Sequence, residues 1–355
     1  MSYTNGLDKP SDYFVTKLYA GNGGTNAQTG VGFAPNWVWI KNRSGADNNA
    51  LYDTIRGANK VIVSNNTNAE GSQSDGLTAF GTDGFTVGAD GAVNTNGNNF
   101  VAWNWKAGTS FTNDASGTGI GSIDSAGSVN QDAGFSICSY TGAGGVITVK
   151  HGLSTVPQVI ITKNRDDANH WAVFHHKNTS VPETDFLKLS DTAATTDDGD
   201  IWNDTAPTSA IFTAGDHSSS NRSGDAMVAY LFSEVKGYSK FGSYTGNGNA
   251  DGTFVYTGFK PAWIMVKCTT TANSYDHWVI YDNKRLGYNI AGNRKIYANS
   301  NAAEAGDDDL LDILSNGFKF RNTHSNVNGS GQTFIYMCFA ENPFVTSTGV
   351  PATAR

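Results

Sequence analysis

Charged side chains, long apolar runs and cysteine are all scarce in this sequence of 355 residues. Charged residues make up 16% of it, and 24 basic residues stand against 32 acidic ones, which gives a formal net charge of −8. A protein that holds nucleic acid by its phosphates needs a basic face, and no Lys/Arg cluster is present, so we expect no nucleic-acid partner. The start has no stretch apolar enough for a signal peptide, and no later run could span a bilayer. We therefore expect neither secretion by the usual route nor membrane insertion.

The three cysteines, Cys138, Cys268 and Cys338, form no close-spaced pair. An odd number of cysteines within apolar runs indicates small buried hydrophobes rather than a disulfide framework or a metal site. The sequence also lacks a nucleophile elbow, a P-loop and a dinucleotide-binding fingerprint. We therefore predict a protein that is not an enzyme and that carries no cofactor and no metal.

Glycine, with 41 residues, and aromatic side chains, at 12%, take the place of the missing charges. Glycine, asparagine and serine favour turns, whereas aromatic residues favour strands. Aromatic rings also build a core from few residues, because each ring buries a large apolar area. The composition therefore predicts an all-β fold with many turns.

Four features recur three times in the same order along the chain. The first is a tyrosine before a glycine turn, at Tyr19, Tyr140 and Tyr244. The second is a glycine and a proline that lead through an apolar run to a lysine: GFAPNWVWIK (32–41), GLSTVPQVIITK (152–163) and GFKPAWIMVK (258–267). The third is an aromatic residue followed by a polar one: Tyr52-Asp53, Phe174-His175 and Tyr281-Asp282. The fourth is a closing apolar strand: FVAWNWKAG (100–108), MVAYLFSEV (227–235) and FIYMCFAEN (334–342).

The repeated segment is roughly 100 residues long, which is too long for a solenoid or propeller repeat. Each copy is therefore predicted to be a domain. We expect three tandem antiparallel β-sandwich modules, jelly-roll or lectin-like, that arose from an internal repeat. They cover residues 1–106, 134–236 and 237–355, the last with a C-terminal tail. Residues 107–133 have few large apolar side chains and are expected to form an extended linker. The one predicted helix covers Asp307 to Ser315, where acidic residues precede Leu and Ile at helical spacing.

The closing strands carry apolar residues on both pleat faces, which indicates an interior strand covered on each side or a strand at a domain contact. Trp37 and Trp39 share one pleat face, as do Trp103 and Trp105, because side chains alternate along a strand. If these tryptophan pairs were exposed to solvent, they would form a platform on which a sugar could stack. Trp105 aligns with Phe232 and Phe339, so we favour a place in the core.

Nine residues are candidates for a ligand-binding or partner-binding surface: Trp37, Lys41, Arg43, Asp53, Trp171, His175, Lys267, Trp278 and Asp282. For the recurring lysines, including Lys163, the alternative that we favour is a strand end whose charge reaches out to water. The histidines around Trp171 could bind a metal or act in acid–base chemistry, but polar loop residues are the favoured interpretation. Two acidic clusters, 197–200 and 307–309, could hold calcium, although a solvated turn and a helix N-terminus are favoured.

Several segments of the sequence resemble a family of proteins of marine tailed bacteriophages. The resemblance rests on GFAPNWVWIKNR (32–43), YDTIRG (52–57), FVAWNWKAG (100–108), AGFSICSYTG (133–142) and FAENPF (339–344). Members of that family are regarded as virion structural proteins, described as tail fibre, minor tail or capsid-associated. The second copy departs most, because Phe174-His175 replaces Tyr-Asp there.

The resemblance implies a non-enzymatic virion surface protein, either a capsid decoration or a tail component. It would be made in the host cytoplasm, assemble as a symmetric homo-oligomer and contact other virion proteins. The alternative is a tail protein that recognises a host surface glycan, which predicts exposed aromatic residues near Trp37, Trp171 or Trp278. A glycan depolymerase needs paired carboxylates across a groove, and the sequence offers no such pair.

Overall fold

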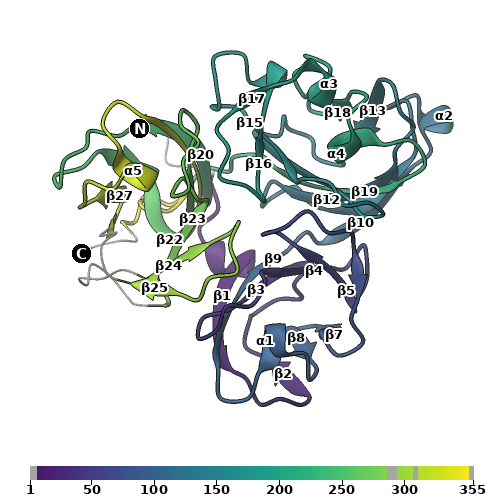
Figure 1. The fold of residues 1–355 in the computed structure, drawn as a ribbon. Helices are drawn as coiled ribbons and strands as arrows, with labels where there is room; N and C mark the ends of the chain where they lie inside the picture. The colour runs from purple at the N-terminus through teal and green to yellow at the C-terminus, as the bar shows by residue number, and fades with distance from the viewer. Residues whose placement is uncertain (1–5, 286–293, 307–310, 352–355) are drawn as a thin grey trace.

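The computed structural model describes residues 6–285, 294–306 and 311–351. This part of the chain consists mainly of antiparallel strands joined by turns and a few helices of one turn, so the predicted all-β class is confirmed (Figure 1). The strands form three large sheets and three small ones. Each large sheet and the small sheet that faces it across one core is called a unit below, numbered 1 to 3 along the chain.

The three large sheets share one order of six strands, to which unit 2 adds β10 and β11 at one edge. In unit 1 the order is β1 (Phe14–Ala20), β9 (Asn99–Trp105), β3 (Trp37–Asn42), β4 (Ala50–Asp53), β5 (Lys60–Val63) and β6 (Gly71–Ser72). In unit 2 it is β10 (Thr109–Asn113), β11 (Ser125–Asn130), β12 (Phe135–Thr141), β19 (Ala226–Phe232), β14 (Val159–Asn164), β15 (Ala172–His175), β16 (Asp185–Lys188) and β17 (Thr196–Asp197). In unit 3 it is β20 (Ser239–Thr245), β28 (Thr333–Pro343), β22 (Phe259–Cys268), β23 (Val279–Asp282), β24 (Arg294–Tyr297) and β25 (Ala305–Gly306).

The small sheets and the helices complete the units. The small sheets are β2 (Asn26–Gln28), β8 (Gly84–Val87) and β7 (Leu77–Gly81) in unit 1, β13 (Ile147–Lys150) and β18 (Ile211–Ala214) in unit 2, and β21 (Phe254–Tyr256), β27 (Gly317–Phe320) and β26 (Leu311–Leu314) in unit 3. The helices are α1 (Gly91–Asn94), α2 (Ala115–Thr118), α3 (Gly199–Trp202), α4 (Ser218–Asn221) and α5 (Ser325–Asn328), with 3₁₀ turns η1 (Pro10–Asp12) and η2 (Pro182–Thr184). A one-turn helix therefore precedes the closing strand of every unit.

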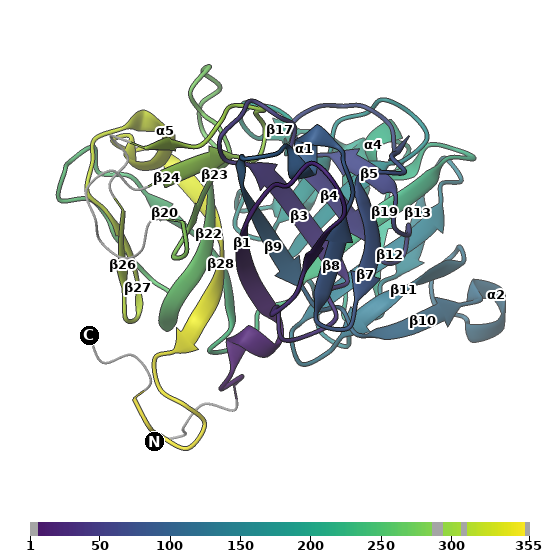
Figure 2. The ribbon, with the colours of Figure 1, turned by 90° about the horizontal axis from the view of Figure 1, so that it is seen from below.

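Each closing strand lies inside its sheet, as the apolar character of both its faces predicts. Strands β9, β19 and β28 each pair with the tyrosine-bearing strand on one side and with the lysine-bearing strand on the other. One face of each large sheet packs on its own small sheet, which gives three separate cores. The opposite faces of all three large sheets meet in a fourth core. Figure 1 shows the three units around this common centre, and Figure 2 shows the strands of units 1 and 2 in two adjacent layers.

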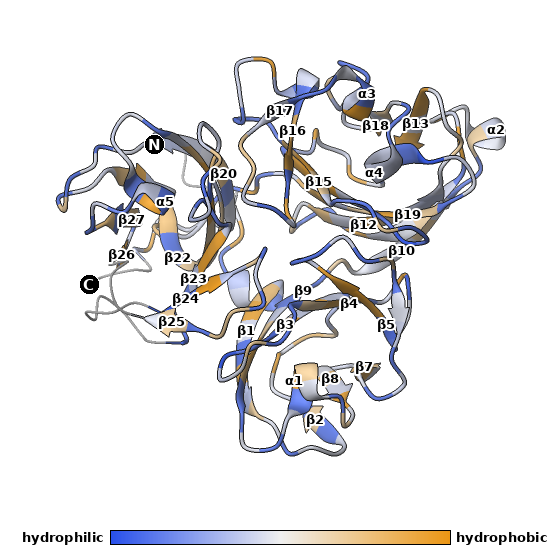
Figure 3. Cartoon of the chain, in the orientation of Figure 1, coloured by the Kyte–Doolittle hydropathy of each residue, from blue (hydrophilic) through white to orange (hydrophobic). Residues whose placement is uncertain are grey.

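The shared core is rich in aromatic rings from all three closing strands. Trp37 stacks on Tyr230 of unit 2, with ring centroids 4.5 Å apart. Trp105 meets Trp263 of unit 3 edge to face at 5.7 Å, and Phe232 meets Phe339 at 5.8 Å. The prediction that the paired tryptophans belong to a core is confirmed, and the hydropathy colouring places apolar strand segments at this centre (Figure 3).

The predicted linker is wrong, because residues 107–133 contain β10, α2 and β11. The β10–β11 hairpin extends the large sheet of unit 2 by pairing β11 with β12 over six residues. Its small side chains fit this place, since a Cβ on Gly127 would lie 2.0 Å from the carbonyl oxygen of Ile137. A lack of large side chains here reflects close backbone packing rather than an absence of structure.

The predicted helix over 307–315 is also wrong where the structure describes it. Residues 311–314 form β26, whose side chains alternate between buried and half-buried and which pairs with β27. Residues 307–310, with the acidic cluster predicted there, lie outside the described residues. Pairing with Phe318 and Phe320 overrides the helical spacing of Leu and Ile, because strand propensity depends on what the strand packs against.

Candidate functional site

Eight of the nine predicted site residues are buried, with no more than 7% of the side chain exposed: Trp37, Lys41, Asp53, Trp171, His175, Lys267, Trp278 and Asp282. The ninth, Arg43, is half-buried in an ion pair. The prediction of an open binding surface at these positions is therefore corrected. The structure places them where one unit contacts the next, and this set of contacts is called the junction below.

The polar residue after the repeated aromatic reaches across the junction to the closing strand of another unit. Unit 1 reaches unit 2, unit 2 reaches unit 3 and unit 3 reaches unit 1, so the contacts run in a circle. Asp53 Oδ2 accepts from the hydroxyl of Tyr230 (2.6 Å), His175 Nε2 lies 3.2 Å from the carbonyl oxygen of Tyr336, and Asp282 Oδ2 accepts from Nε1 of Trp103 (3.0 Å).

The histidine in the second copy fits the partner that it meets. The register places Trp103, Tyr230 and Met337 at the same point of the three closing strands. The first two offer an N–H or O–H to an aspartate, whereas Met337 offers no donor. His175 instead donates from Nε2 to a backbone carbonyl, and its Nδ1 accepts from the backbone amide of Lys177 at 3.1 Å. Burial, together with the nearby His176, lowers the pKa of His175 to about 3, so the ring is neutral at pH 7.

An arginine three residues on neutralises each junction aspartate. Arg56 Nε donates to Asp53 at 2.5 Å, and Arg285 Nε donates to Asp282 at 2.6 Å. All four side chains are fully buried. The second copy has Asn178 at this place and no carboxylate to pair, which agrees with the neutral His175.

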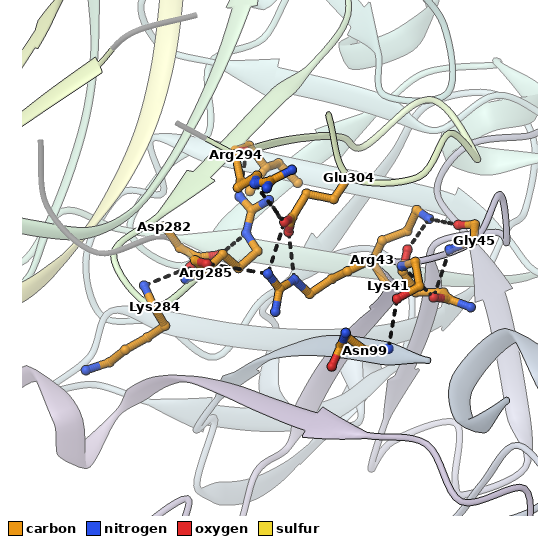
Figure 4. Close-up of polar contacts among 12 residues, drawn as sticks. Lys41, Arg43, Gly45, Asn99, Asp282, Lys284, Arg285, Arg294 and Glu304 are labelled. Carbon is orange, nitrogen blue, oxygen red and sulfur yellow. Dashed lines mark hydrogen bonds and ion pairs between the residues drawn. The ribbon is translucent and has the colours of Figure 1, made fainter. Parts of the chain in front are cut away.

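A second set of contacts follows the same circle at the lysine end of the strands, and Figure 4 shows the one between Arg43 and Glu304. Arg43 of unit 1 binds both oxygens of Glu304 of unit 3, at 2.7 and 3.0 Å. Arg165 of unit 2 binds Glu70 of unit 1 in the same way, at 2.9 and 3.1 Å. The third contact has no charges: the amide of Thr195 donates to the carbonyl of Thr269 at 3.0 Å. The third copy lacks the Asn-Arg that follows the lysine in the other two.

The three recurring lysines are fully buried, so the favoured interpretation that their charge reaches water is wrong. Each Nζ donates to backbone carbonyl oxygens, those of Asn42, Asn164 and Cys268, at 2.6 to 2.7 Å. Lys163 also contacts Thr67 of unit 1, and Lys267 contacts Thr192 of unit 2. Burial lowers the pKa of all three to about 8. Carbonyl oxygens at the strand ends take the place of water around the amines.

Trp171 and Trp278, near which a glycan-binding protein would have exposed aromatic residues, belong to the same circle of contacts. Trp171 Nε1 donates to the carbonyl of Val63 in unit 1 at 2.9 Å, and Trp278 Nε1 donates to that of Lys188 in unit 2 at 2.9 Å. Asn49 stands before the equivalent strand of unit 1 and donates to the carbonyl of Tyr297 in unit 3 at 3.1 Å. These indoles bury their faces and use their N–H groups, so they offer no stacking surface to a sugar.

No group of three or more His, Cys, Asp or Glu side chains among residues 6–285, 294–306 and 311–351 is arranged to hold a metal ion. His170 contacts Ser190, and His176 contacts the carbonyl of Phe241 in unit 3. Asp198 caps α3 by accepting from the amide of Asp200. The three cysteines are buried and free, as predicted.

Sequence reasoning missed a repeated asparagine at the end of the helix before each closing strand. Asn94, Asn221 and Asn328 are each buried and bind backbone groups of the glycine turn in their own unit. The repeated tyrosines add a bond from their hydroxyl to the neighbouring helix residue, Val93, Ser220 or Val327. The signal was present, because each asparagine stands three residues before a glycine in the sequence: Gly97, Gly224 and Gly331.

No helix in the described ranges is long and apolar enough to cross a membrane. A search among curated proteins finds no match. The sequence from residue 9 to residue 343 matches the family described as "Domain of unknown function (DUF7483)", and the chain belongs to that family.

Proposed function

We propose that the three units are β-sandwich modules that descend from one ancestral module and that act as a single rigid body. The same strand order in the three large sheets supports common descent. The circular contacts at the junction support rigidity, because equivalent residues of each unit bind the next.

We propose that this rigid body is a non-enzymatic structural protein on the surface of a bacteriophage virion, as a capsid decoration or a tail component. The observation that carries the proposal is the burial of the repeated charged and aromatic residues: they join the units instead of lining an open site. The resemblance to marine phage structural proteins is the reason for placing the protein on a phage virion in this proposal. Other virion proteins and further copies of the chain are the proposed partners.

Electron cryomicroscopy of a phage that encodes this chain tests the proposal. We expect density on the capsid or tail that fits the three units, and the loss of that density from particles made without the gene. Particles that lack the gene yet show unchanged density, together with absence of the chain from purified virions, would refute it.

A further inference from the structure

One side of each unit contains a seam between its large sheet and its small sheet. The seam runs between the tyrosine-bearing strand of the large sheet (β1, β12 or β20) and the first strand of the small sheet (β2, β13 or β21). Edge strands present unpaired backbone groups that natural proteins cover or block. The three units close this seam in different ways.

In unit 2 the β10–β11 hairpin closes the seam. Strand β11 pairs with β12. Residues at and before the start of β11 bind the other edge: the amide of Ser122 donates to the carbonyl of Thr148 at 2.8 Å, and the hydroxyl of Ser125 donates to the carbonyl of Lys150 at 2.8 Å. At the far end Gln131 Nε2 donates to the carbonyl of Gly152 at 2.6 Å. One inserted segment therefore covers both edges.

In unit 1 side chains close the seam. Lys17 of β1 extends across it and donates to the carbonyl of Thr29 at 2.8 Å. Asn26 of β2 donates in the opposite direction, to the carbonyl of Ala20 at 3.0 Å. These two bonds occupy carbonyls on both edges.

In unit 3 the seam is open along β21. On the β20 side the backbone of Phe241 is occupied, because its amide donates to Glu234 Oε1 at 2.8 Å and its carbonyl accepts from His176 Nε2 at 2.8 Å. The register places Gly242 where unit 1 has Lys17, so this residue has no side chain that could reach across the seam.

A cavity of about 630 Å³ lies at the Ser239 end of the seam. It is lined by Ser239 and Lys240 of β20, by Tyr256 of β21, and by residues of the connection before β20 and of the segment after β28. Among the described residues, only the bond from Thr253 to Thr245 joins the two edges, at one end of the seam.

The open seam carries exposed aromatic side chains. Phe254 and Tyr256 of β21 are 44% and 60% exposed, and Phe344 beside the cavity is 38% exposed. Within the described ranges no hydrogen bond crosses from the backbone of Phe254 or Tyr256 to another segment on the seam side. Large exposed aromatic residues on an unpaired edge mark an interaction site.

We propose that the unit 3 seam binds an extended segment of a partner protein as a β-strand added to the free edge of β21. Unit 2 shows the chemistry that fits: the segment that fills its seam, Ser122–Gln131, has small and mostly uncharged side chains, with apolar Ile123 and Val129 packed on the unit core. Backbone hydrogen bonds hold such a strand, and pockets for alternate side chains select it. Phe254 and Tyr256 would cover the apolar side chains of the incoming strand.

The occupant is a different protein rather than a second copy of this chain. Among the described residues the segment with this chemistry is the β10–β11 hairpin, and it is already paired with β12 along its length. The inference goes beyond the proposed function, since it names the chemistry of a partner and holds whether or not that partner is a virion protein.

The test uses the full chain and a fluorescent peptide with the sequence of residues 122–131. Fluorescence anisotropy should show saturable binding with a Kd below about 1 mM, which corresponds to about −4 kcal/mol. The double variant F254K/Y256K should raise that Kd about tenfold or more, because lysines on an edge oppose strand addition. The matched control is Tyr275→Lys, which changes another exposed aromatic residue of unit 3, in the β22–β23 loop, and should leave binding unchanged.

Thermal melting checks that both variants fold, which is expected because the altered side chains are exposed. The absence of saturable binding, or binding that F254K/Y256K leaves unchanged, overturns the proposal. Self-association of the chain that F254K/Y256K abolishes assigns the seam to a second copy and also overturns it. So does binding of a saccharide, but not of the peptide, that depends on Phe254 and Tyr256.

Discussion

At the residue scale, one position of the repeat holds Asp53, His175 and Asp282, and each residue suits the group that it meets. An aspartate accepts from Tyr230 or Trp103, whereas the histidine donates to a carbonyl beside Met337. A buried polar group without a partner costs free energy, so donor and acceptor must match at each contact. The departure of the second copy from the Tyr-Asp pattern is therefore explained by its neighbour in unit 3.

This pairing predicts that the protein loses stability in acid. The pKa of His175 falls from 6.5 to about 3 on folding, so the unfolded chain binds more protons between these values. The contribution of His175 to the free energy of unfolding is fully present above pH 6.5 and is lost as the pH falls toward 3. Between pH 7 and 4.5 the loss from this group alone is about 3 kcal/mol. Burial also lowers the pKa of His151, to about 4, which adds to the decline.

His175→Gln isolates the contribution of His175, because glutamine keeps a donor and does not titrate. Urea unfolding at pH 7 and at pH 4.5 should show a smaller loss of stability in this variant than in the wild type. His324→Gln, at an exposed histidine, is the matched control. An equal loss in H175Q and wild type would contradict the assignment.

The buried ion pairs give a second prediction at this scale. Asp53→Asn removes the closer carboxylate from Arg56, which is fully buried and keeps the longer ion pair with Glu70, at 3.3 Å. Breaking a buried pair from one side costs about 3 kcal/mol or more, whereas an exposed pair is worth under about 1 kcal/mol. Urea unfolding should therefore separate D53N from the control Asp12→Asn, which removes a surface pair with Lys9. Equal stability of the two variants would show that the Asp53–Arg56 pair contributes little.

The sequence identified the junction positions but could not say what they face. A polar residue after an aromatic, or a lysine after an apolar run, has the same pattern whether its partner is a ligand, water or another unit. Asp53 and Tyr230 are separated by 177 residues, and no local spacing relates them. Their pairing depends on the packing of whole sheets.

At the element scale, the repeat predicted the strands that recur in every copy and failed where one copy has its own feature. The closing strands and the lysine-bearing strands stand in the sheets as their apolar patterns indicate. The β10–β11 hairpin has no counterpart among the described residues of the other copies, and its small side chains resemble those of a linker. Strand β26 has helical spacing, and only its pairing with β27 makes it a strand.

The hairpin gives a prediction for Gly127, whose missing side chain permits its contact with β12. Gly127→Val should push β11 away from Ile137 and Phe111, because the added Cβ overlaps both. Hydrogen exchange of residues 109–130 should rise at least about tenfold, while exchange in β9 and β28 stays low, since local opening is independent of the global core. The control Ala126→Val changes the exposed neighbour and should leave exchange in the hairpin slow. Slow exchange in G127V would show that the sheet tolerates the side chain.

At the scale of the whole molecule, three separate cores were expected. The structure has a fourth core, shared by the three units, so the units are not independent of one another. The strands that face it carry large apolar side chains such as Trp37, Tyr230 and Phe339, which a single unit would expose to water. Each unit therefore depends on the other two for burial of one sheet face. The sequence indicated that the second face is buried, because both faces of the closing strands are apolar. It did not specify what covers that face.

The shared core predicts that the chain unfolds as one cooperative body. Separation of any unit exposes aromatic surface of the other two, so partial unfolding has no stable intermediate. Calorimetry should show one transition with a calorimetric enthalpy equal to the van't Hoff enthalpy. Trp37→Ala, which removes a ring that touches both Trp105 and Tyr230, should destabilise that single transition by about 3 to 5 kcal/mol without splitting it. Phe254→Ala removes an exposed ring of unit 3 and should leave the transition in place. Three resolved transitions, with only the first unit sensitive to W37A, would mean that the units are independent domains in contact and that the junction is a surface between them.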